Sequence, residues 1–338
     1  MYYKWLDQRD EQRAQRGEEA KLPSAFRIDS HLAFPSVDQD TTIDEFCHLA
    51  EQSVSDGKYF DLPELAFSDC RLDGEWLTFP SLVATAVEQN NTVWARVTQS
   101  GAKNKVLVVF HHWNASKWQN TISKFFSRRG ITVVEMAMPY HFQRSRPGAD
   151  YADDMLSSNL GKTMQSVRQG VLDGRILIQW LKSEGYGEIS VLGMSLGSWV
   201  AGLISAHDTN VAKTSLFLTA GSLADMVWEG RATRSIRQSL DGNIGRPIFQ
   251  RAWAPLNMEN YAHLLMRPEL DLELVLGKRD KVVPPEISKN FVAALNKTGV
   301  GLRLTELNCG HYTLGLPQYI IRAGLKLNAQ MNRSSFSL

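Results

Sequence analysis

The sequence predicts an α/β protein with a mostly parallel β-sheet that is covered by helices on both faces. Near-continuous apolar runs alternate with helical patterns over most of the chain, which is typical of parallel strands joined by crossover helices. Because such crossovers are right-handed, the alternation indicates a doubly wound sandwich. The size and composition agree, since the 338 residues are 43% hydrophobic and 22% charged, as expected of a soluble globular protein with one large core.

The first part of the chain is predicted to be a helical extension, residues 1–70, packed on a main domain that spans 71–332. The run 42–54 has helical spacing, with Ile43 and Phe46 on one side of the expected helix. This extension is polar and highly charged at its start, and nothing in it suggests chemistry.

Eight strands are expected in the main domain. The first two form an antiparallel hairpin within 75–99 that turns at Gln89–Asn91. The other six are the runs 105–112, 131–138, 188–195, 214–221, 271–280 and 301–308. Helices are expected at 116–130, 161–185, 198–206, 286–298 and 317–330, the first of them closed by Gly130 and the second by Gly185.

One long stretch, 222–262, interrupts the alternation between the strands 214–221 and 271–280. A loop of this length without structure would be unusual, so we expect a helical insertion. It leaves from the carboxyl edge of a strand, and we interpret it as a lid over that edge. Apolar side chains that could give such a lid an exposed lipid-binding face are Trp228, Ile244, Ile248, Phe249 and Trp253.

The pentapeptide 193–197, Gly-Met-Ser-Leu-Gly, ends an apolar run and directly precedes a helical pattern. A strand, then Gly-x-Ser-x-Gly, then a helix is the order of a nucleophile elbow, a tight turn that exposes the serine hydroxyl at the edge of a sheet. Only small residues fit beside the serine in that turn. We therefore predict Ser195 to be a nucleophile, with an ordinary glycine-rich turn as the alternative.

A nucleophilic serine needs a base, and the base needs a carboxylate that holds it. Asp280 follows a predicted strand, and His311 follows the last one. The order Ser, acid, His is that of the α/β-hydrolases. Asp225, which follows the preceding strand, is an alternative acid.

The third requirement is a pair of N–H groups for the oxyanion. The backbone of Leu196 supplies one, and the turn after the strand 105–112 supplies the other, by position from Trp113. Two adjacent histidines, His111 and His112, stand in that turn. A metal site there is disfavoured, because adjacent residues rarely bind one ion and no carboxylate or thiol cluster accompanies them.

From about residue 80 to 330 the chain resembles an α/β-hydrolase-fold serine hydrolase of the esterase-like abhydrolase-domain type. The resemblance rests on the elbow, on Lys-x-Asp-x-x-Val-Pro at 278–284 and on Gly-His at 310–311. Met-Pro-Tyr at 138–140 and Glu-Gly-Tyr-Gly at 184–187 match one abhydrolase-domain group more narrowly. The resemblance implies an eight-stranded sheet with a lid and the roles given above to Ser195, Asp280 and His311. One departure is His112, which stands where many members have glycine.

Candidate substrate-binding residues are His112, His141 and Trp228, although His141 is favoured as a residue that caps its loop. Arg144 and Arg146 could bind an anionic group, with surface solvation as the alternative for at least one of them. Trp113 and Trp199 are further candidates for an apolar acyl pocket, and Trp199 fits a helix core equally well.

Charge and composition exclude several classes of protein. A formal net charge of +1 gives no electrostatic case for binding nucleic acid. No apolar run approaches the roughly 18 residues of a membrane span, and the amino-terminal segment lacks the apolar core of a signal peptide. The cysteines Cys47, Cys70 and Cys309 have no metal or redox spacing, which predicts reduced thiols and a cytoplasmic location. Cys309 is expected to be a small apolar residue rather than a nucleophile.

Together these features predict a serine hydrolase that cleaves a small-molecule carboxylic ester through an acyl-enzyme and needs no cofactor. A thioesterase, a peptidase or an acyltransferase would use the same triad. A binding protein that keeps the fold without turnover is an alternative of another class. The oligomeric state stays open.

Overall fold

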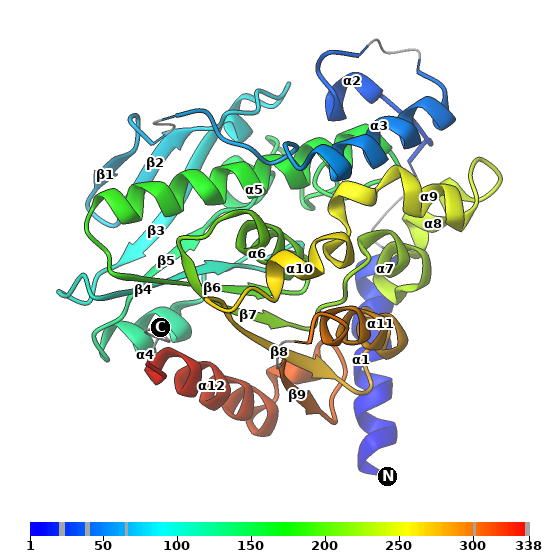
Figure 1. Cartoon of the computed structure of the whole chain (residues 1–338). Coiled ribbons are helices and arrows are strands. Elements are labelled where there is room, and N and C mark those ends of the chain that lie inside the picture. Colours follow the sequence, from blue (N-terminus) through cyan, green and yellow to red (C-terminus); the bar gives the residue numbers. More distant parts are fainter. Residues whose placement is uncertain (20–23, 38–40, 65–66, 300–301, 335–338) are drawn as a thin grey trace.

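The protein is described by a computed structural model that covers residues 1–19, 24–37, 41–64, 67–299 and 302–334. A single sheet runs through it, with the strand order β1-β2-β3-β5-β4-β6-β7-β8-β9 (Figure 1). The strands are β1 (Arg71–Asp73), β2 (Trp76–Pro80), β3 (Thr92–Thr98), β4 (Lys105–Phe110), β5 (Thr132–Met136), β6 (Glu188–Met194), β7 (Val211–Phe217), β8 (Asp271–Gly277) and β9 (Arg303–Leu307).

The helices alternate with these strands along the chain. The α-helices are α1 (Tyr2–Glu19), α2 (Ser30–Ala33), α3 (Ile43–Asp56), α4 (Asn120–Ser127), α5 (Leu160–Ser183), α6 (Leu196–His207), α7 (Leu223–Glu229), α8 (Arg234–Leu240), α9 (Arg246–Ala252), α10 (Ala262–Leu265), α11 (Pro285–Asn296) and α12 (Pro317–Asn332). Short 3-10 helices are η1 (Glu88–Asn91), η2 (Phe142–Arg144), η3 (Arg231–Thr233), η4 (Ala254–Leu256), η5 (Met258–Tyr261) and η6 (Thr313–Gly315).

The sheet confirms the predicted topology and adds one strand. From β5 through β4 and β6 to β9 all neighbours are parallel, while β2 and β3 form the expected antiparallel hairpin. The sheet has nine strands where eight were predicted. The additional strand is β1, which pairs antiparallel with β2. Its three residues are all exposed, so β1 has no apolar pattern by which the sequence could reveal it.

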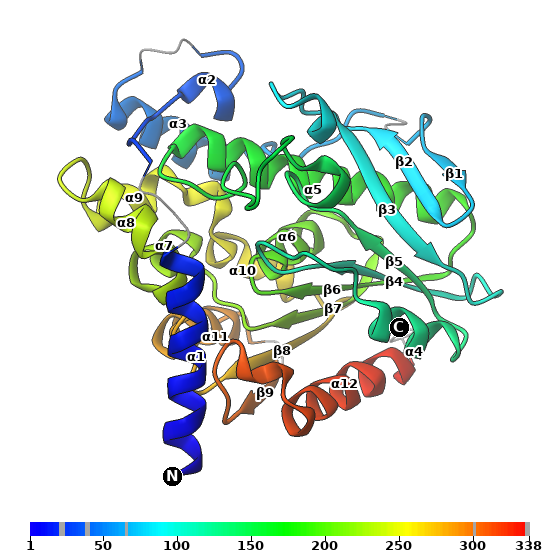
Figure 2. The same cartoon turned by 180° about the vertical axis from the view of Figure 1, so that it is seen from behind.

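Two apolar clusters pack the opposite faces of the sheet. Helices α5 and α6 lie on one face, and α4 and α12 lie on the other (Figures 1 and 2). The central strand β6 is buried through its middle five residues, as expected of a parallel strand covered on both sides. Helix α5 begins at the Asn159 side chain, which accepts a hydrogen bond from the Lys162 N–H (3.0 Å), and the chain turns away at Gly185 with φ +87°.

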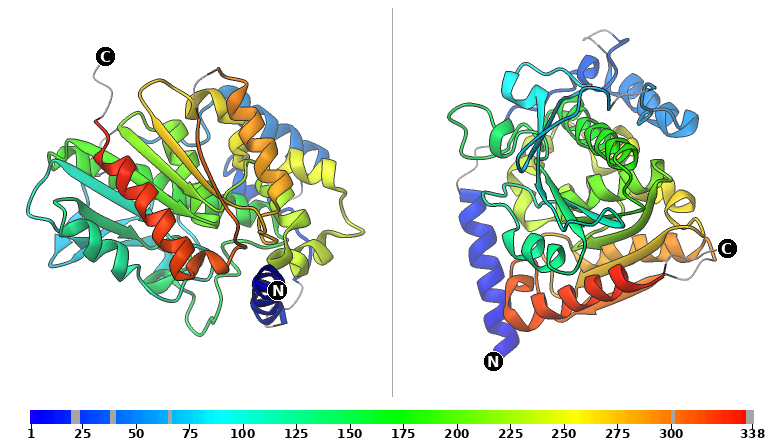
Figure 3. Two further views of the ribbon diagram at one scale, coloured as in Figure 1. Left: turned by 90° about the horizontal axis from the view of Figure 1, so that it is seen from below. Right: turned by 90° about the vertical axis from the view of Figure 1, so that its left-hand side faces the viewer.

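The amino-terminal extension lies on the main domain at two separate places. Helix α3 buries Phe46, Cys47 and Ala50 and packs against α9 of the insertion. Helix α1 runs beside the loops that follow β8 and β9, where it contacts η3 and η6 (Figure 2; Figure 3, right). The extension is therefore not one helical layer, and α1 lies at the edge of the sheet where the parallel strands end.

The insertion after β7 is helical, as expected, and consists of α7 to α10 with the short helices η3 to η5. Its apolar side chains do not form an exposed face: Phe249 and Trp253 are fully buried, and Ile244 is 7% exposed. Trp228 and Ile248 are half-buried. The alternative in which these five residues form an exposed lipid-binding face is therefore wrong, because none of the five side chains is exposed.

Over the described part of the chain, no helix combines the length and the apolar character needed to cross a membrane.

Candidate active site

Ser195 lies in the tight turn between β6 and α6. Its backbone has φ 52° and ψ −125°, in the left-handed half of conformational space that side chains rarely occupy. The turn is held by the Ser195 N–H, which donates to the Phe217 carbonyl oxygen (2.9 Å), and by the Ser198 N–H, which donates to the Ser195 carbonyl oxygen (2.7 Å). The strand and the helix thus fix the serine at the carboxyl edge of the sheet.

The glycines on both sides of this serine are required by close backbone contacts. A Cβ atom on Gly193 would lie 2.4 Å from the Gly197 carbonyl oxygen. A Cβ atom on Gly197 would lie 2.3 Å from the His111 carbonyl oxygen. Because these neighbours are backbone atoms, any side chain at either position displaces the turn.

Asp280 and His311, the predicted acid and base, form a hydrogen-bonded pair. Oδ2 of Asp280 lies 2.7 Å from Nδ1 of His311. Oδ1 of Asp280 accepts hydrogen bonds from the N–H groups of Val282 and Val283, both at 2.8 Å. With Nδ1–H donating to the carboxylate, a neutral imidazole keeps the lone pair on Nε2 for a proton acceptor role. His311 and Ser195 line the same cavity of about 1050 Å³.

The alternative acid Asp225 lies elsewhere. It belongs to α7, where its Oδ1 receives hydrogen bonds from Arg246 and Gln250, both at 2.7 Å. Asp225 lines a second cavity and not the one that contains Ser195. Of the two acids that the sequence offers, only Asp280 contacts His311.

Of the two predicted oxyanion residues, Leu196 directly follows Ser195 and Trp113 lines the same cavity. Leu196 is the first residue of α6, so its N–H has no partner inside the helix. Trp113 follows β4 and lines the cavity, while its indole Nε1–H donates to the Ala152 carbonyl oxygen (3.0 Å). The side chain of Trp113 is therefore fixed at the cavity wall.

Two buried histidines support the turn that carries Trp113. His141 is 2% exposed; its Nδ1–H donates to the Pro139 carbonyl oxygen (2.8 Å) and its Nε2 accepts from the Asn114 N–H (3.0 Å). His111 likewise donates to the His112 carbonyl oxygen (2.9 Å) and accepts from the Met138 N–H (3.1 Å). Burial lowers the pKa of His141 to about 4 and that of His111 below its usual range. Both rings are neutral, fully bonded supports of the loop.

Of the three candidate substrate-binding residues, His112 is among the described residues that line the cavity of Ser195, and the other two are not. His112 lines the cavity, where desolvation and then the neighbouring His311 ring lower its pKa to about 4. His141 is not among the described lining residues, and its contacts are those of a loop cap. Trp228 is not among them either, because it packs in the insertion with its ring 6.1 Å from that of Phe249. Trp199 is fully buried in α6.

Strained backbone gathers at this edge of the sheet. Among the described residues other than glycine, those with positive φ include Asn114 after β4, Tyr140 and Phe142 after β5, Ser195 after β6 and Leu218 after β7. Such conformations persist only where the surrounding structure holds them, and they concentrate at functional sites. The positive-φ residues therefore gather at the carboxyl edge of the sheet, where Ser195 lies.

Asp10 on α1 is a residue of this site that the sequence analysis missed. Its Oδ1 accepts hydrogen bonds from the N–H groups of Tyr312 (3.1 Å) and Thr313 (2.8 Å), directly after His311. Asp10 is 5% exposed, and burial raises the pKa of its carboxyl group. A Cβ atom on Gly310 would lie 1.4 Å from Oδ2 of Asp10, so the glycine of the Gly-His pair makes room for it. Helix α1 therefore fixes the loop that carries the base.

The other candidates in the sequence have structural partners. Arg144 is fully buried and pairs with Asp173 (2.8 Å), and Arg146 pairs with Asp154 (2.7 Å), so neither guanidinium faces the cavity of Ser195. Cys309 is fully buried, and burial raises the pKa of its thiol to about 12, which agrees with a packing role. Within the described ranges no group of three or more His, Cys, Asp or Glu side chains could hold a metal ion.

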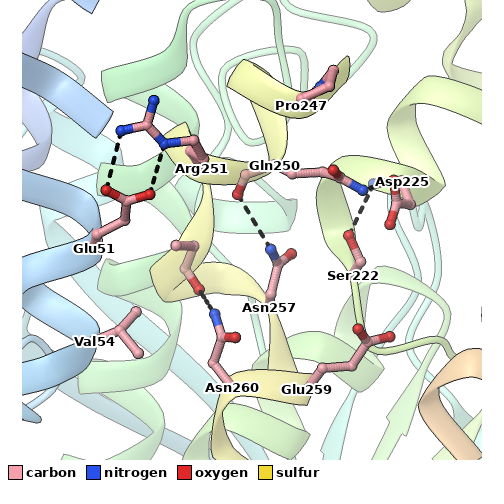
Figure 4. A pocket seen from close by; sticks show the side chains of 11 residues that line it. Glu51, Val54, Ser222, Asp225, Pro247, Gln250, Arg251, Asn257, Glu259 and Asn260 are labelled. Atoms are coloured by element: carbon pink, nitrogen blue, oxygen red, sulfur yellow. Dashed lines mark hydrogen bonds and ion pairs between the residues drawn. The ribbon is translucent and has the colours of Figure 1, made fainter. Parts of the chain in front are cut away.

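A second cavity of about 550 Å³ lies between α3, α7 and α9 (Figure 4). Most of its polar side chains bond to one another or to the backbone: Glu51 pairs with Arg251 (2.7 Å), and the Asn260 amide donates to the Ala254 carbonyl oxygen (2.8 Å). Burial and then the neighbouring Asp225 raise the pKa of the Glu259 carboxyl group. It shares no described lining residue with the cavity of Ser195. Because most of these polar groups already have partners, the described lining residues of the second cavity offer no reactive set of side chains.

The comparisons with known proteins place the fold. Neither models of protein families nor curated protein sequences gave a match. Among solved structures, a puromycin-hydrolyzing peptidase of Mycobacterium tuberculosis superposes with a TM-score of 0.60 at 18% identity, over 81% of this chain and 41% of that one. An acylaminoacyl peptidase of Pyrococcus horikoshii gives 0.59 at 14% identity, over 79% and 43%.

The third similar structure has the size of this chain's main domain. The alpha/beta hydrolase GrgF of a Penicillium species gives a TM-score of 0.53 at 15% identity, over 78% of this chain and all of that one. By contrast, this chain spans about two fifths of the length of the two peptidases. The order of the sheet, the strained serine after β6 and these superpositions agree: the chain has the α/β-hydrolase fold.

Proposed function

We propose that the chain is a serine hydrolase that cleaves a carboxylic ester through an acyl-enzyme. The observation that carries the proposal is the pair Asp280–His311, joined at 2.7 Å, in the cavity that also contains Ser195 in its strained turn. A buried carboxylate that holds Nδ1 of a histidine is the arrangement that prepares Nε2 as a general base.

In the proposed reaction Nε2 of His311 takes the proton of the Ser195 hydroxyl, and the serine oxygen attacks the ester carbonyl carbon. The N–H groups of Leu196 and Trp113 stabilise the oxyanion. The bond from carbon to the alcohol oxygen then breaks, and His311 gives its proton to the departing alcohol. Water repeats the sequence, which releases the acid and restores the serine. Asp280 stabilises the imidazolium that forms in each step.

The sharpest test is labelling with a neutral alkyl fluorophosphonate, followed by intact mass and peptide mapping. We expect one adduct, on Ser195, and none in Ser195→Ala. Ser183→Ala, which removes a serine that hydrogen-bonds only within α5, is the matched control and should label like the wild type. Asp280→Asn should label about 10³-fold more slowly, since it disturbs the tautomer of the base.

A folded wild-type protein without an adduct would refute the proposal and leave the binding protein that keeps the fold. If the adduct forms, a panel of esters, thioesters and peptides defines the acyl acceptor. Peptides belong in the panel because two structural neighbours are named peptidases, and all three substrate classes pass through the same acyl-enzyme.

A further inference from the structure

Helix α1 forms one wall of the cavity that contains Ser195. The residues of α1 that line the cavity are Trp5, Gln8, Arg9, Gln12, Arg13, Ala14, Arg16 and Gly17. The loops after the strands supply the opposite wall, with His112, Ser195 and His311 among them. A substrate that reaches Ser195 therefore lies against α1, although this helix is the first element of the chain.

Three acidic side chains on α1 form ion pairs with arginines of the main domain. Asp7 pairs with Arg279 (2.8 Å). Glu11 pairs with Arg231 (2.6 Å), and Glu18 pairs with the same guanidinium. These contacts, together with those of Asp10, dock the helix through its negative charges.

The arginines of α1 lie on the side of the helix that lines the cavity. Arg9, Arg13 and Arg16 are four and three residues apart, so they share one face of the helix. Arg9 lies over the ring of Trp5 and Arg13 over the ring of Tyr312, each 5.4 Å from the ring centroid. No ion pair joins any of the three to an acid in the described part of the chain, and all three are exposed.

The cavity itself contains no compensating negative charge. None of the described residues that line it is Asp or Glu. Like charges at these spacings repel one another along a helix, and an anion that enters the cavity removes the repulsion. Guanidinium groups bind carboxylate and phosphate oxygens in bidentate geometry.

We propose that the substrate carries an anionic group, a carboxylate or a phosphate, which Arg9 and Arg13 bind while its ester reaches Ser195. The proposal rests on the proposed function and assigns the substrate class to the same site. It also moves anion recognition to the amino-terminal helix from Arg144, which is paired inside the domain, and from Arg146, which is exposed and pairs with Asp154.

The test uses a set of alkyl fluorophosphonates that differ only at the end of the chain, which is a carboxamide, a carboxylate or a phosphate monoester, prepared in several chain lengths. The readout is the second-order rate constant for labelling Ser195. We expect the wild type to react with one of the anionic probes at least fivefold faster than with the carboxamide. The carboxylate and phosphate arms show which anion is preferred.

The variant Arg9→Gln/Arg13→Gln should lower the anionic rate constant by about tenfold and leave the carboxamide rate within about twofold. Arg9→Lys/Arg13→Lys keeps the charge and should retain part of the preference. Lys4→Gln removes a positive charge from α1 outside the cavity lining and should change neither rate. Rising salt should slow only the anionic probes.

The outcomes separate the two proposals. If the carboxamide probe labels Ser195 and the ratio of anionic to neutral rates is the same in the wild type and in Arg9→Gln/Arg13→Gln, the anion proposal is overturned and the hydrolase proposal stands. If no probe labels Ser195 in the folded protein, both are overturned. A ratio that falls to about one in the double variant supports both.

Discussion

The contact between Asp10 and the loop after His311 gives the most direct test of the role of α1. Asp10→Ala leaves the N–H groups of Tyr312 and Thr313 without their acceptor in a buried place. An orphaned donor costs about 1–3 kcal/mol, so the pair should cost roughly 3 kcal/mol. For a chain of 338 residues, with an unfolding entropy of about 2.1 cal/mol/K per residue, this lowers Tm by about 4 °C.

The assay combines thermal unfolding with the rate of fluorophosphonate labelling at Ser195. Because the loop that carries His311 loses its anchor, we expect Asp10→Ala to label at least about tenfold more slowly. Asp10→Asn keeps an acceptor oxygen and should lose less in both measurements. Asp7→Ala is the matched control: it removes an ion pair whose side chains are about one third exposed, which should cost at most about 1 kcal/mol.

A double-mutant cycle with Gly310 sharpens the test. A methyl group at Gly310 collides with the Asp10 carboxylate, so Gly310→Ala should slow labelling on its own. In the Asp10→Ala background the collision with the carboxylate is gone and a close contact with the Arg279 carbonyl oxygen (3.2 Å) remains. The second substitution should therefore cost less there than in the wild type. If Asp10→Ala unfolds and labels like Asp7→Ala, or if the two effects simply add, the reasoning about this contact is refuted.

Three further predictions concern the scaffold. Gly193→Ala should reduce labelling of Ser195 more than 100-fold, because the added Cβ atom collides with backbone atoms of the turn, while circular dichroism should show that the fold is retained. The control is Gly245→Ala, whose Cβ atom would have no neighbour closer than 3.8 Å and which should label like the wild type. Asp173→Ala should cost about 3–5 kcal/mol in denaturant unfolding, since it leaves the buried Arg144 unpaired, and Arg144→Met in that background should restore part. The pKa of His141 is about 4 in the folded protein and about 6.5 in the unfolded chain, so the neutral ring stabilises the fold above pH 6.5 and this contribution is lost as the pH falls toward 4. His141→Gln removes the titrating group and should reduce the change in the free energy of unfolding over this pH range by up to about 3 kcal/mol.

The sheet, and the edge of it at which the candidate catalytic residues lie, could be predicted because both are local or topological. Apart from β9, of which only Leu307 is buried, each parallel strand is an apolar run that can be recognised without its neighbours. Parallel strands end at one edge, so the sequence predicts that Ser195, Asp280 and His311, which follow three different strands, lie at that edge. Strand β1 escaped because its three residues are exposed and it pairs only at the end of the sheet.

The directions of single side chains could not be predicted, because tertiary packing sets them. Trp228 and Arg144 stand in segments that border the site, yet one packs in the insertion and the other pairs with Asp173 inside the domain. Asp10 is the extreme case. It lies 303 residues before its partner Thr313, and in the sequence it is one more acid in a charged helix, which predicts a solvated surface.

Helix α1 has three faces, and each makes a different kind of contact. Leu6 and Asp10 point into the domain, Asp7 and Glu11 pair with Arg279 and Arg231, and Arg9 belongs to the face that lines the cavity. Asp10 acts on the base, so its loss should slow every probe alike. Arg9 acts on the substrate, so its loss should slow only the anionic ones. Two substitutions one position apart on the same helix therefore predict different kinetic signatures, and a helix that merely covered the domain would give neither.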